Sequence, residues 1–340
     1  MRYVGIDLDK QSITVCVVDQ DRNVLQTRRF ACVEVDRIVA FFAGLGPFEA
    51  VVEATAGYQW LLERIEPLAR RVVLAHPGKM RIIAESTKKS DKLDARTLAE
   101  FLALDMVPQA YRPTPRQREH RALVRHRQFL QKQRTQLRVK VRRVVSDYNA
   151  DRRDLFSRRG LESLQAVPLS DSDRFILGQM LAQLRGIEEQ SAAVRRQLRA
   201  FAAAASEAEA RGRRVLRSVI GVGEVTAEVV LAETGDVGRF RSARQVVAYA
   251  GLAPGRRESA GKVRDLGITK RGSPLLRWVL VEASWQAVRH SGYWRGVYTA
   301  LKKRRGSRRA IVAVARRLLG VLVALLRSGQ EYREPAATAA

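Results

Sequence analysis

One serine in the last third of the chain stands among many cations. Ser259 lies in the stretch Gly251 to Arg277, whose glycines and charges predict a loop just ahead of a helix start at Ser273-Pro274. The basic residues of this stretch are Arg256, Arg257, Lys262, Arg264, Lys270, Arg271 and Arg277. A hydroxyl in such surroundings suits a phosphodiester, because guanidinium and ammonium groups bind phosphate oxygens. A solvated turn serine with no ligand is the alternative, since serine is common in turns.

Four acidic residues near the start of the chain occupy positions that favour metal chemistry. Asp7 lies inside the apolar segment GIDLD, and Glu53 follows the apolar residues AVV. A carboxylate inside a strand is costly unless it is paired or binds a cation. Asp91 and Asp94 are three residues apart, so on a helix they share a face. Four converging carboxylates predict Mg²⁺ or Mn²⁺, which activate oxygens in phosphodiester chemistry.

The same acidic residues also fit roles without a metal cluster. Asp91 could cap a helix in competition with Ser90, and Asp94 could interact with the dipole of its first turn. An aspartate in a first strand before a turn is also typical of sugar kinases and actin-like ATPases. That alternative lacks a second glycine-rich phosphate loop and leaves the charge of the chain unexplained.

The net charge indicates the class of partner. The 340 residues include 62 Lys and Arg against 35 Asp and Glu, a formal charge of +27. Such a field concentrates polyanions, so a nucleic acid is the expected partner. The most apolar run, Ile311 to Leu326, is interrupted by Arg316 and Arg317 and predicts no membrane span. With no signal peptide in MRYVGIDLDK, we expect a cytoplasmic protein without a membrane partner.

The acidic residues fall in a stretch that reads as an α/β domain over residues 1–110. Residues 2–35 break like a meander of three strands, and alternating helix and strand patterns follow to about residue 104. This order predicts a mixed sheet. Pro108, Pro113 and Pro115 mark a linker after it. The two cysteines and four scattered histidines predict neither a disulfide framework nor a zinc site.

Residues 111–212 predict a basic helical domain. Residues 112–160 contain 16 basic and 4 acidic residues, and an apolar residue recurs every seven positions at Leu123, Leu130, Leu137 and Val144. A second amphipathic pattern covers residues 175–205. The two patterns predict an antiparallel helical hairpin or a dimerising coiled coil. An ordinary amphipathic helix pair packed on its own domain is equally compatible with them.

Residues 213–330 predict a mainly helical domain that ends in helices at 274–290 and 307–327, followed by a disordered tail at 331–340. Gly221 and Gly223 form a tight turn between two apolar helices near its start. Backbone N–H groups in such turns meet DNA phosphates in helix-hairpin-helix modules. A helix connection without a ligand is the alternative.

Two sets of motifs resemble the IS-one-ten type of insertion-sequence transposase. The segments GIDLDK, VVEATAGY and KSDKLDARTLAEFL resemble the DEDD catalytic set of its RuvC-like domain. The segments SVIGVGEVTAEVVLAETGDVGRF and AYAGLAPGRRESAGKVRDLGITKRGSPLLRWVLVEA are similar to its transposase domain. The resemblance covers nearly the whole chain. It implies an RNase H-like first domain, a coiled-coil middle and a mainly helical C-terminal transposase domain.

The resemblance also implies a function. Such a protein is a site-specific DNA recombinase, bacterial or archaeal and nucleoid-associated, which uses a structured guide (bridge) RNA from its own element to pair with donor and target DNA. The family's acidic residues fall on Asp7, Glu53, Asp91 and Asp94, with Mg²⁺ or Mn²⁺ as cofactor, and its nucleophile falls on Ser259. Family members often carry Ser-Gly-Gly or Ser-Ser-Gly where this chain has Ser259-Ala260-Gly261.

The implied assembly is a homo-oligomer, a dimer or tetramer, whose active site joins the acidic set of one subunit to the serine of another. Strand exchange then passes through a covalent phosphoserine. Two alternatives assign these residues other roles or none. A Holliday-junction-type nuclease would use the carboxylates, a metal and water, leaving Ser259 idle, and a non-catalytic nucleic-acid-binding scaffold would use neither.

Overall fold

The computed structural model describes residues 1–83, 91–259 and 262–335, with only the backbone described at 81–83, 91–93, 256–259 and 262–265. The chain divides into two compact units, Met1–Arg112 and Pro113–Ala340. No helix among the described residues is long and apolar enough to cross a membrane.

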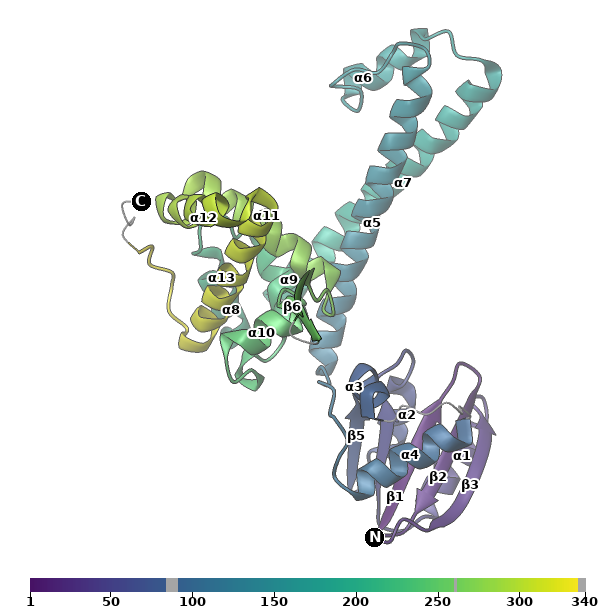
Figure 1. Cartoon of the computed structure of the whole chain (residues 1–340). Coiled ribbons are helices and arrows are strands. Elements are labelled where there is room, and N and C mark those ends of the chain that lie inside the picture. The colour runs from purple at the N-terminus through teal and green to yellow at the C-terminus, as the bar shows by residue number, and fades with distance from the viewer. Residues whose placement is uncertain (84–90, 260–261, 336–340) are drawn as a thin grey trace. The chain divides into compact units, whose positions relative to one another are not determined.

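A five-stranded mixed sheet organises the N-terminal unit (Figure 1). Its strands are β1 (Arg2–Leu8), β2 (Ser12–Val18), β3 (Val24–Ala31), β4 (Phe48–Glu53) and β5 (Arg71–Ala75), in the order β3-β2-β1-β4-β5. The first three strands pair antiparallel, and β4 and β5 run parallel to β1. The expected meander and the mixed-sheet α/β class are therefore confirmed.

Helices cover the sheet on both faces, because its central strands alternate between two apolar sets. Val4, Ile6 and Val52 pack with α1 (Val35–Ala43) and α2 (Gln59–Ile65). The opposite face carries Val51 and Val73, which pack with α3 (Pro77–Ile83) and α4 (Asp91–Ala103). Residues on the second face therefore point toward α4.

Gly5 allows α4 to lie directly against β1. A Cβ atom at Gly5 would stand 1.9 Å from the carbonyl oxygen of Ala95 and 2.5 Å from the nitrogen of Ala99. Ala95 and Ala99 are fully buried, and they present only methyl groups to the sheet. The close approach of helix and strand thus depends on three small residues.

The C-terminal unit is mainly helical, as expected (Figure 1). Its helices are α5 (Pro115–Ser146), α6 (Arg158–Ser163), α7 (Asp171–Ala203), α8 (Glu207–Arg217), α9 (Glu224–Thr234), α10 (Ala243–Tyr249), α11 (Pro274–His290), α12 (Gly292–Arg305) and α13 (Ser307–Ser328). The helices expected at 274–290 and 307–327 are α11 and α13, and α12 lies between them. Its two strands, β6 (Pro254–Ser259) and β7 (Lys262–Ile268), pair antiparallel.

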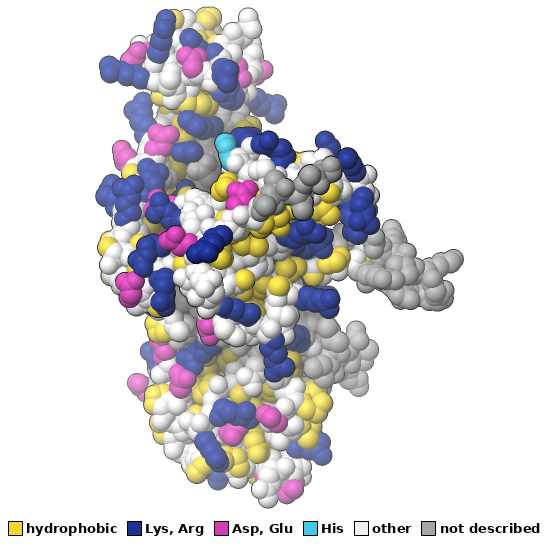
Figure 2. All heavy atoms as spheres, turned by 90° about the vertical axis from the view of Figure 1, so that its left-hand side faces the viewer, with side chains coloured by type: hydrophobic (Ala, Val, Ile, Leu, Met, Phe, Trp, Pro, Cys, Tyr) yellow, Lys and Arg dark blue, Asp and Glu magenta, His cyan; other side chains and the backbone are white. Residues whose placement is uncertain are grey.

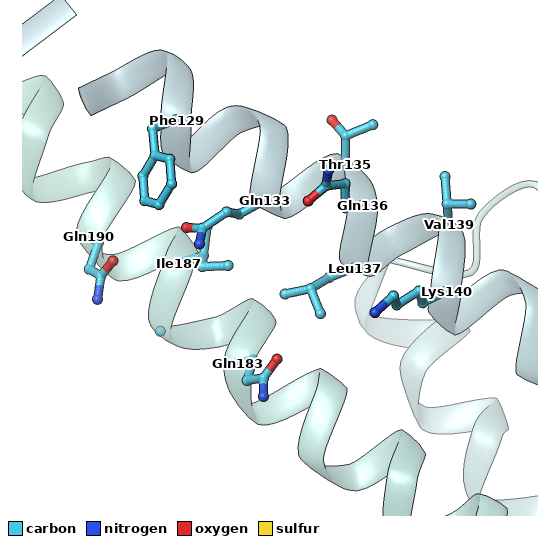
Figure 3. A pocket seen from close by; sticks show the side chains of 11 residues that line it. Phe129, Gln133, Thr135, Gln136, Leu137, Val139, Lys140, Gln183, Ile187 and Gln190 are labelled. Carbon is cyan, nitrogen blue, oxygen red and sulfur yellow. The ribbon is translucent and has the colours of Figure 1, made fainter. Parts of the chain in front are cut away.

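Helices α5 and α7 pack side by side in opposite directions (Figure 1). The hairpin has an apolar cluster at each end, one with Leu130 and Val194 and the other with Val141 and Leu177. Between them lies an open groove of about 1040 Å³, into which Leu137 of α5 and Ile187 of α7 project beside several glutamines (Figure 3). The intrachain hairpin is thus present, and a coiled coil with a second chain stays a prediction.

Ion pairs fix the base of the hairpin to α8 and α9. Glu228 of α9 accepts from Arg213 Nε at 2.8 Å, and its other oxygen lies 2.7 Å from His120 Nε2 of α5. Burial raises the pKa of Glu228, but the contacts with His120 and Arg213 outweigh it and hold that pKa below its usual value. One turn along α5, Arg125 makes a two-point pair with the buried Glu233, at 2.8 and 2.9 Å.

The chain after α13 remains in contact with the helical unit. The backbone nitrogen of Tyr332 donates to Ser218 Oγ at 2.8 Å, and Glu334 accepts from Ser291 and from the nitrogen of Tyr293. Residues 331–335 of the expected tail are therefore held in place, and residues 336–340 lie outside the described residues.

Two glycine substitutions test this packing with opposite expected signs. Gly5→Ala should destabilise the N-terminal unit by at least about 2 kcal/mol, because the new methyl overlaps the backbone of α4. Gly186→Ala, inside α7 with nothing within 4 Å of its Cβ position, should stabilise the chain by about 0.5–1 kcal/mol. Thermal and urea unfolding of the three proteins measures both effects. Equal stability of Gly5→Ala and the wild type would contradict the helix contact.

Candidate active site and nucleic-acid interface

Asp7 and Glu53 occupy neighbouring positions on adjacent strands. In the parallel pairing of β1 with β4, Ile6 is opposite Val52, and one further step brings Asp7 beside Glu53. Adjacent strands lie about 4.8 Å apart, and registered positions share a sheet face. Asp7 is two residues beyond Gly5, so both carboxylates lie on the face covered by α4. Both residues are partly exposed.

The beginning of α4 lies toward the carboxyl ends of β1 and β4, where Asp7 and Glu53 are placed. Ala95 and Ala99 lie over Gly5, whereas Tyr3, which precedes Gly5 in β1, packs against the cluster that contains Leu98 and Leu102, later in the helix. The helix therefore runs antiparallel to the strand, and its first residues lie toward the end of β1 that carries Asp7. Those residues include Asp91, the first of the helix, and Asp94, whose side chain is exposed.

The acidic set suits a divalent cation by its chemistry and its placement. Asp7 and Glu53 offer only oxygen ligands, as Mg²⁺ and Mn²⁺ prefer, and they lie side by side where α4 begins. Among the side chains described, no group of three or more His, Cys, Asp and Glu residues is placed to hold a metal ion. The side chain of Asp91 is not among them, so the full set of four stays a prediction.

Ser259 ends the first strand of a β-hairpin. The expectation of a loop is wrong for this stretch, because β6 and β7 pair through Arg257 with Arg264 and through Ser259 with Lys262. Side chains two residues apart share a face, so these four positions lie on one face of the hairpin. Arg256 is instead opposite Asp265 on the other face. Ala260 and Gly261 lie outside the described residues.

Close backbone contacts hold the base of this hairpin. A Cβ atom at Gly272 would stand 2.0 Å from the carbonyl oxygen of Tyr249, and one at Gly251 would stand 2.6 Å from the nitrogen of Gly272. Arg277 Nη1 donates to the carbonyl oxygens of Gly272 at 2.6 Å and Ala250 at 3.2 Å. Burial lowers the pKa of Arg277. Arg277 therefore joins α10, the 270–273 turn and α11.

The other cations of the stretch differ from Arg277. Lys270 and Arg271 are exposed beside the hairpin, so their side chains are available to a phosphate. Lys270 has a positive φ of 56°, and its nitrogen donates to the carbonyl oxygen of Gly251 at 3.0 Å. The expected helix start is confirmed next to them, since Ser273 Oγ accepts from the nitrogen of Leu276 and Pro274 is the first residue of α11.

The two glycines of the α8–α9 turn have different surroundings. Gly221 has a φ of +88°, and a Cβ there would stand 2.6 Å from the backbone of Ala283 and Ala287, so packing alone requires a glycine. Gly223 is exposed, has nothing within 4 Å of its Cβ position and precedes α9 without a side-chain cap. Its neighbourhood offers free backbone N–H groups to an anion.

Known protein families match both units. Residues 213–299 match a family model described as "Transposase IS116/IS110/IS902 family", and residues 4–150 match a model for the DEDD transposases of this group, described as "Transposase". The chain belongs to the IS116/IS110/IS902 family of transposases. It is thus an enzyme of DNA transposition, and the match to the family's RNase H-like DEDD domain covers the N-terminal unit and continues through α5.

Relatives of this transposase family match over almost the whole chain. One is the transposase for insertion sequence element IS1111A of Coxiella burnetii, 28% identical, with 98% of this chain and 92% of the relative covered. Another is a probable family 20 transposase of Pseudomonas aeruginosa, 27% identical, with 97% and 98% covered. A putative transposase, y4qE, of Sinorhizobium fredii is 43% identical over 21% of this chain and 18% of its own length.

Arg277 and Arg271 form a matched pair for a test of the hairpin base. Arg277→Gln should lower the free energy of unfolding by about 1–2 kcal/mol, because it leaves two partly buried carbonyl groups without this donor. Arg271→Gln removes the same charge from an exposed position and should change stability by less than about 0.5 kcal/mol. Urea unfolding of both variants measures these free energies. Equal losses of stability in the two variants would refute the structural role of Arg277.

Proposed function

We propose that this transposase is an RNA-guided, site-specific DNA recombinase that exchanges strands through a covalent phosphoserine at Ser259. The placement of Asp7 beside Glu53, at the edge of the sheet where α4 begins, is the main support for a phosphodiester site. Ser259 at the tip of a cationic hairpin, in a domain matched to the family, supports the nucleophile.

The serine step conserves the energy of the phosphodiester bond. Ser259 Oγ attacks phosphorus, an Oγ–P bond forms, and the bond from phosphorus to the 3′ oxygen of the DNA breaks. The hydroxyl proton passes to the acidic set, and the leaving 3′ oxygen takes up a proton. Attack by the 3′ hydroxyl of the partner strand reverses these changes and releases the serine. No ATP is required.

The acidic set is proposed to act on the same phosphate. Asp7, Glu53, Asp91 and Asp94 would hold Mg²⁺ or Mn²⁺, which supplies Lewis-acid polarisation of phosphate oxygens when bound. A serine hydroxyl is a weak nucleophile, so it depends on removal of its proton. The carboxylates lie in the N-terminal unit and the serine in the C-terminal unit. We infer that the complete site combines the two units, from different subunits of a dimer or tetramer.

Basic residues near the serine and along the helical unit are proposed to bind nucleic acid. On the serine face of the hairpin these are Arg257, Lys262 and Arg264, with Lys270 and Arg271 beside it. Lys and Arg side chains are spread over the face of the molecule seen in Figure 2. Such a surface suits the backbones of donor and target DNA and of a structured guide RNA, since backbone contacts need no sequence code.

The helical hairpin offers a surface for a second subunit. Several of its large apolar side chains are exposed, among them Phe129, Val139 and Phe175 at 53%, 62% and 68%. Phe129 and Val139 also border the groove between α5 and α7 (Figure 3). A contact between copies through α5 and α7 would cover these side chains, which lie outside the heptad positions Leu130, Leu137 and Val144 that pack within the chain.

Substitution of the two proposed chemical groups tests the mechanism. Ser259→Ala and Asp7→Asn should each lower recombination between plasmid-borne sites by at least about a thousandfold, because the first removes the nucleophile and the second a carboxylate ligand. Product is measured by quantitative PCR across the new junctions. Ser242→Ala and Asp9→Asn, at exposed positions outside the two sites, are the matched controls and should recombine normally.

Trapping a protein–DNA adduct separates this function from the nuclease alternative, which needs the carboxylates of the N-terminal unit but not the serine. Denaturation during the reaction should leave DNA attached to the wild-type chain and not to Ser259→Ala. Cleaved DNA without any adduct, undiminished in Ser259→Ala, would establish hydrolysis instead. Chelation of divalent cations should abolish the adduct, and added Mg²⁺ should restore it.

Salt dependence tests the proposed backbone contacts. Binding of a short RNA hairpin or DNA duplex should weaken by about a thousandfold or more between 50 and 200 mM salt, because six or more neutralised phosphates release their counterions. Fluorescence anisotropy at a series of salt concentrations gives the slope. A flat curve over this range would exclude a phosphate-dominated interface.

A further inference from the structure

Three arginines line a small cavity of about 60 Å³ at the base of the helical hairpin, where α5 and α7 lie beside α9 and α11. Arg127 comes from α5, and Arg195 and Arg199 come from α7, where their spacing of four places them on one helix face. The cavity is bordered by apolar side chains of α5, α7, α9 and α11, namely Val124, Leu198, Val225, Val229 and Leu275. Glu224 and Glu228 complete the lining, so the three cations share the cavity with two carboxylates and five apolar side chains.

These arginines differ from their neighbours in α5 because none of them forms an ion pair in the described part of the chain. Two residues earlier in α5, Arg125 pairs with Glu233, and one turn before that Arg121 Nε donates to the carbonyl oxygen of Ala232 at 2.8 Å. Across the described part of the chain, Arg127, Arg195 and Arg199 make no hydrogen bond or ion pair. Arg127 is partly buried, unlike Arg195 and Arg199, which are exposed.

The charges around Arg127 repel more than they attract. Burial lowers the pKa of Arg127, and the neighbouring charges of Arg195 and Arg134 lower it further, whereas Glu224 raises it. Glu228 also borders the cavity, but it is held by His120 and Arg213. A partly buried guanidinium beside two like charges is costly, and a bound anion removes that cost.

The cavity also adjoins the beginning of α9. Glu224 and Val225, the first two residues of that helix, line it. Gly223 before them provides no side-chain cap, so the N–H groups of the first turn lack an internal acceptor. Backbone donors and guanidinium groups are both ligands of phosphate oxygens.

We propose that Arg127, Arg195 and Arg199 bind a backbone phosphate of a nucleic acid at the base of the helical hairpin. The inference rests on the proposed function and specifies one of its contacts. Arginines from two helices bring five N–H donors each to one point, which suits a tetrahedral phosphate better than a single lysine would. Because the three side chains come from both arms of the hairpin, the bound strand would contact α5 and α7 together with the α8–α9 turn.

The test compares Arg127→Gln with Arg196→Gln in the full-length chain. Arg196 is exposed on α7 next to Arg195 and does not line the cavity, so its substitution removes the same charge from the same region. The probes are a short labelled RNA hairpin and a DNA duplex of the same sequence, titrated at several salt concentrations. Thermal unfolding of each variant is measured in parallel.

Arg127→Gln should weaken binding of at least one probe by about tenfold and lower its salt slope by about 1. Its melting temperature should stay the same or rise, because substitution relieves like-charge repulsion. Arg196→Gln should change affinity by less than about twofold. Arg127→Lys should recover part of the affinity but not all, because it keeps the charge and loses the planar fork. The probe that responds identifies RNA or DNA as the source of the phosphate.

Two results would overturn the site. One is equal binding by Arg127→Gln and Arg196→Gln with a wild-type salt slope. The other is a fall in melting temperature for Arg127→Gln with unchanged affinity, which would give Arg127 a packing role. If the wild-type chain bound neither probe, the proposed function itself would fail. Normal wild-type binding with no effect of Arg127→Gln would remove only this contact.

Discussion

The contact of Gly5 with α4 is the constraint on which the N-terminal site depends. Only a residue without a Cβ lets the carbonyl oxygen of Ala95 come so close to β1. That contact sets how closely the helix lies against β1, two residues before Asp7. The carboxylates therefore owe their common location to backbone packing, since carboxylates alone repel one another. A catalytic arrangement of like charges has to be imposed by the scaffold that carries it.

The same principle applies to the hairpin that carries Ser259. Gly251 and Gly272 allow the 270–273 turn to lie against the end of α10, and Arg277 ties the two backbones together. The base of the hairpin is thus fixed to the helical core, while its serine lies at the opposite end, beside the turn. The proposed attack of Ser259 on a phosphate would benefit from this arrangement, because the anchored base sets the direction in which the hairpin extends.

Sequence patterns predicted the elements well where apolar residues set the period. The strands that carry Asp7 and Glu53 and the helices of the hairpin have such a pattern, whereas the start of α11 follows from the capping serine and the proline after it. The β6–β7 pair has no such pattern, because nearly half of its residues, PGRRES and KVRDLGI, are charged and its apolar residues do not alternate regularly. The adjacency of Asp7 and Glu53 follows from pairing of strands 46 positions apart along the chain, a register that no local pattern encodes. The glycine contacts share this limit, since their partners are distant backbone atoms.

The charge of the chain shows most clearly what a sequence leaves open. A formal charge of +27 indicates a polyanionic partner but gives every cation the same weight. In α5, Arg121 donates to backbone carbonyl groups and Arg125 pairs with Glu233. Arg127 forms no ion pair, and the charges near it are those of two arginines and of Glu224. These three arginines lie within seven positions of one helix and are indistinguishable by type. Folding satisfies the first two internally, so substituting them would report on stability. The third is left to an external anion, which is why charge that stays uncompensated after folding is a sharper guide to a binding site than charge itself.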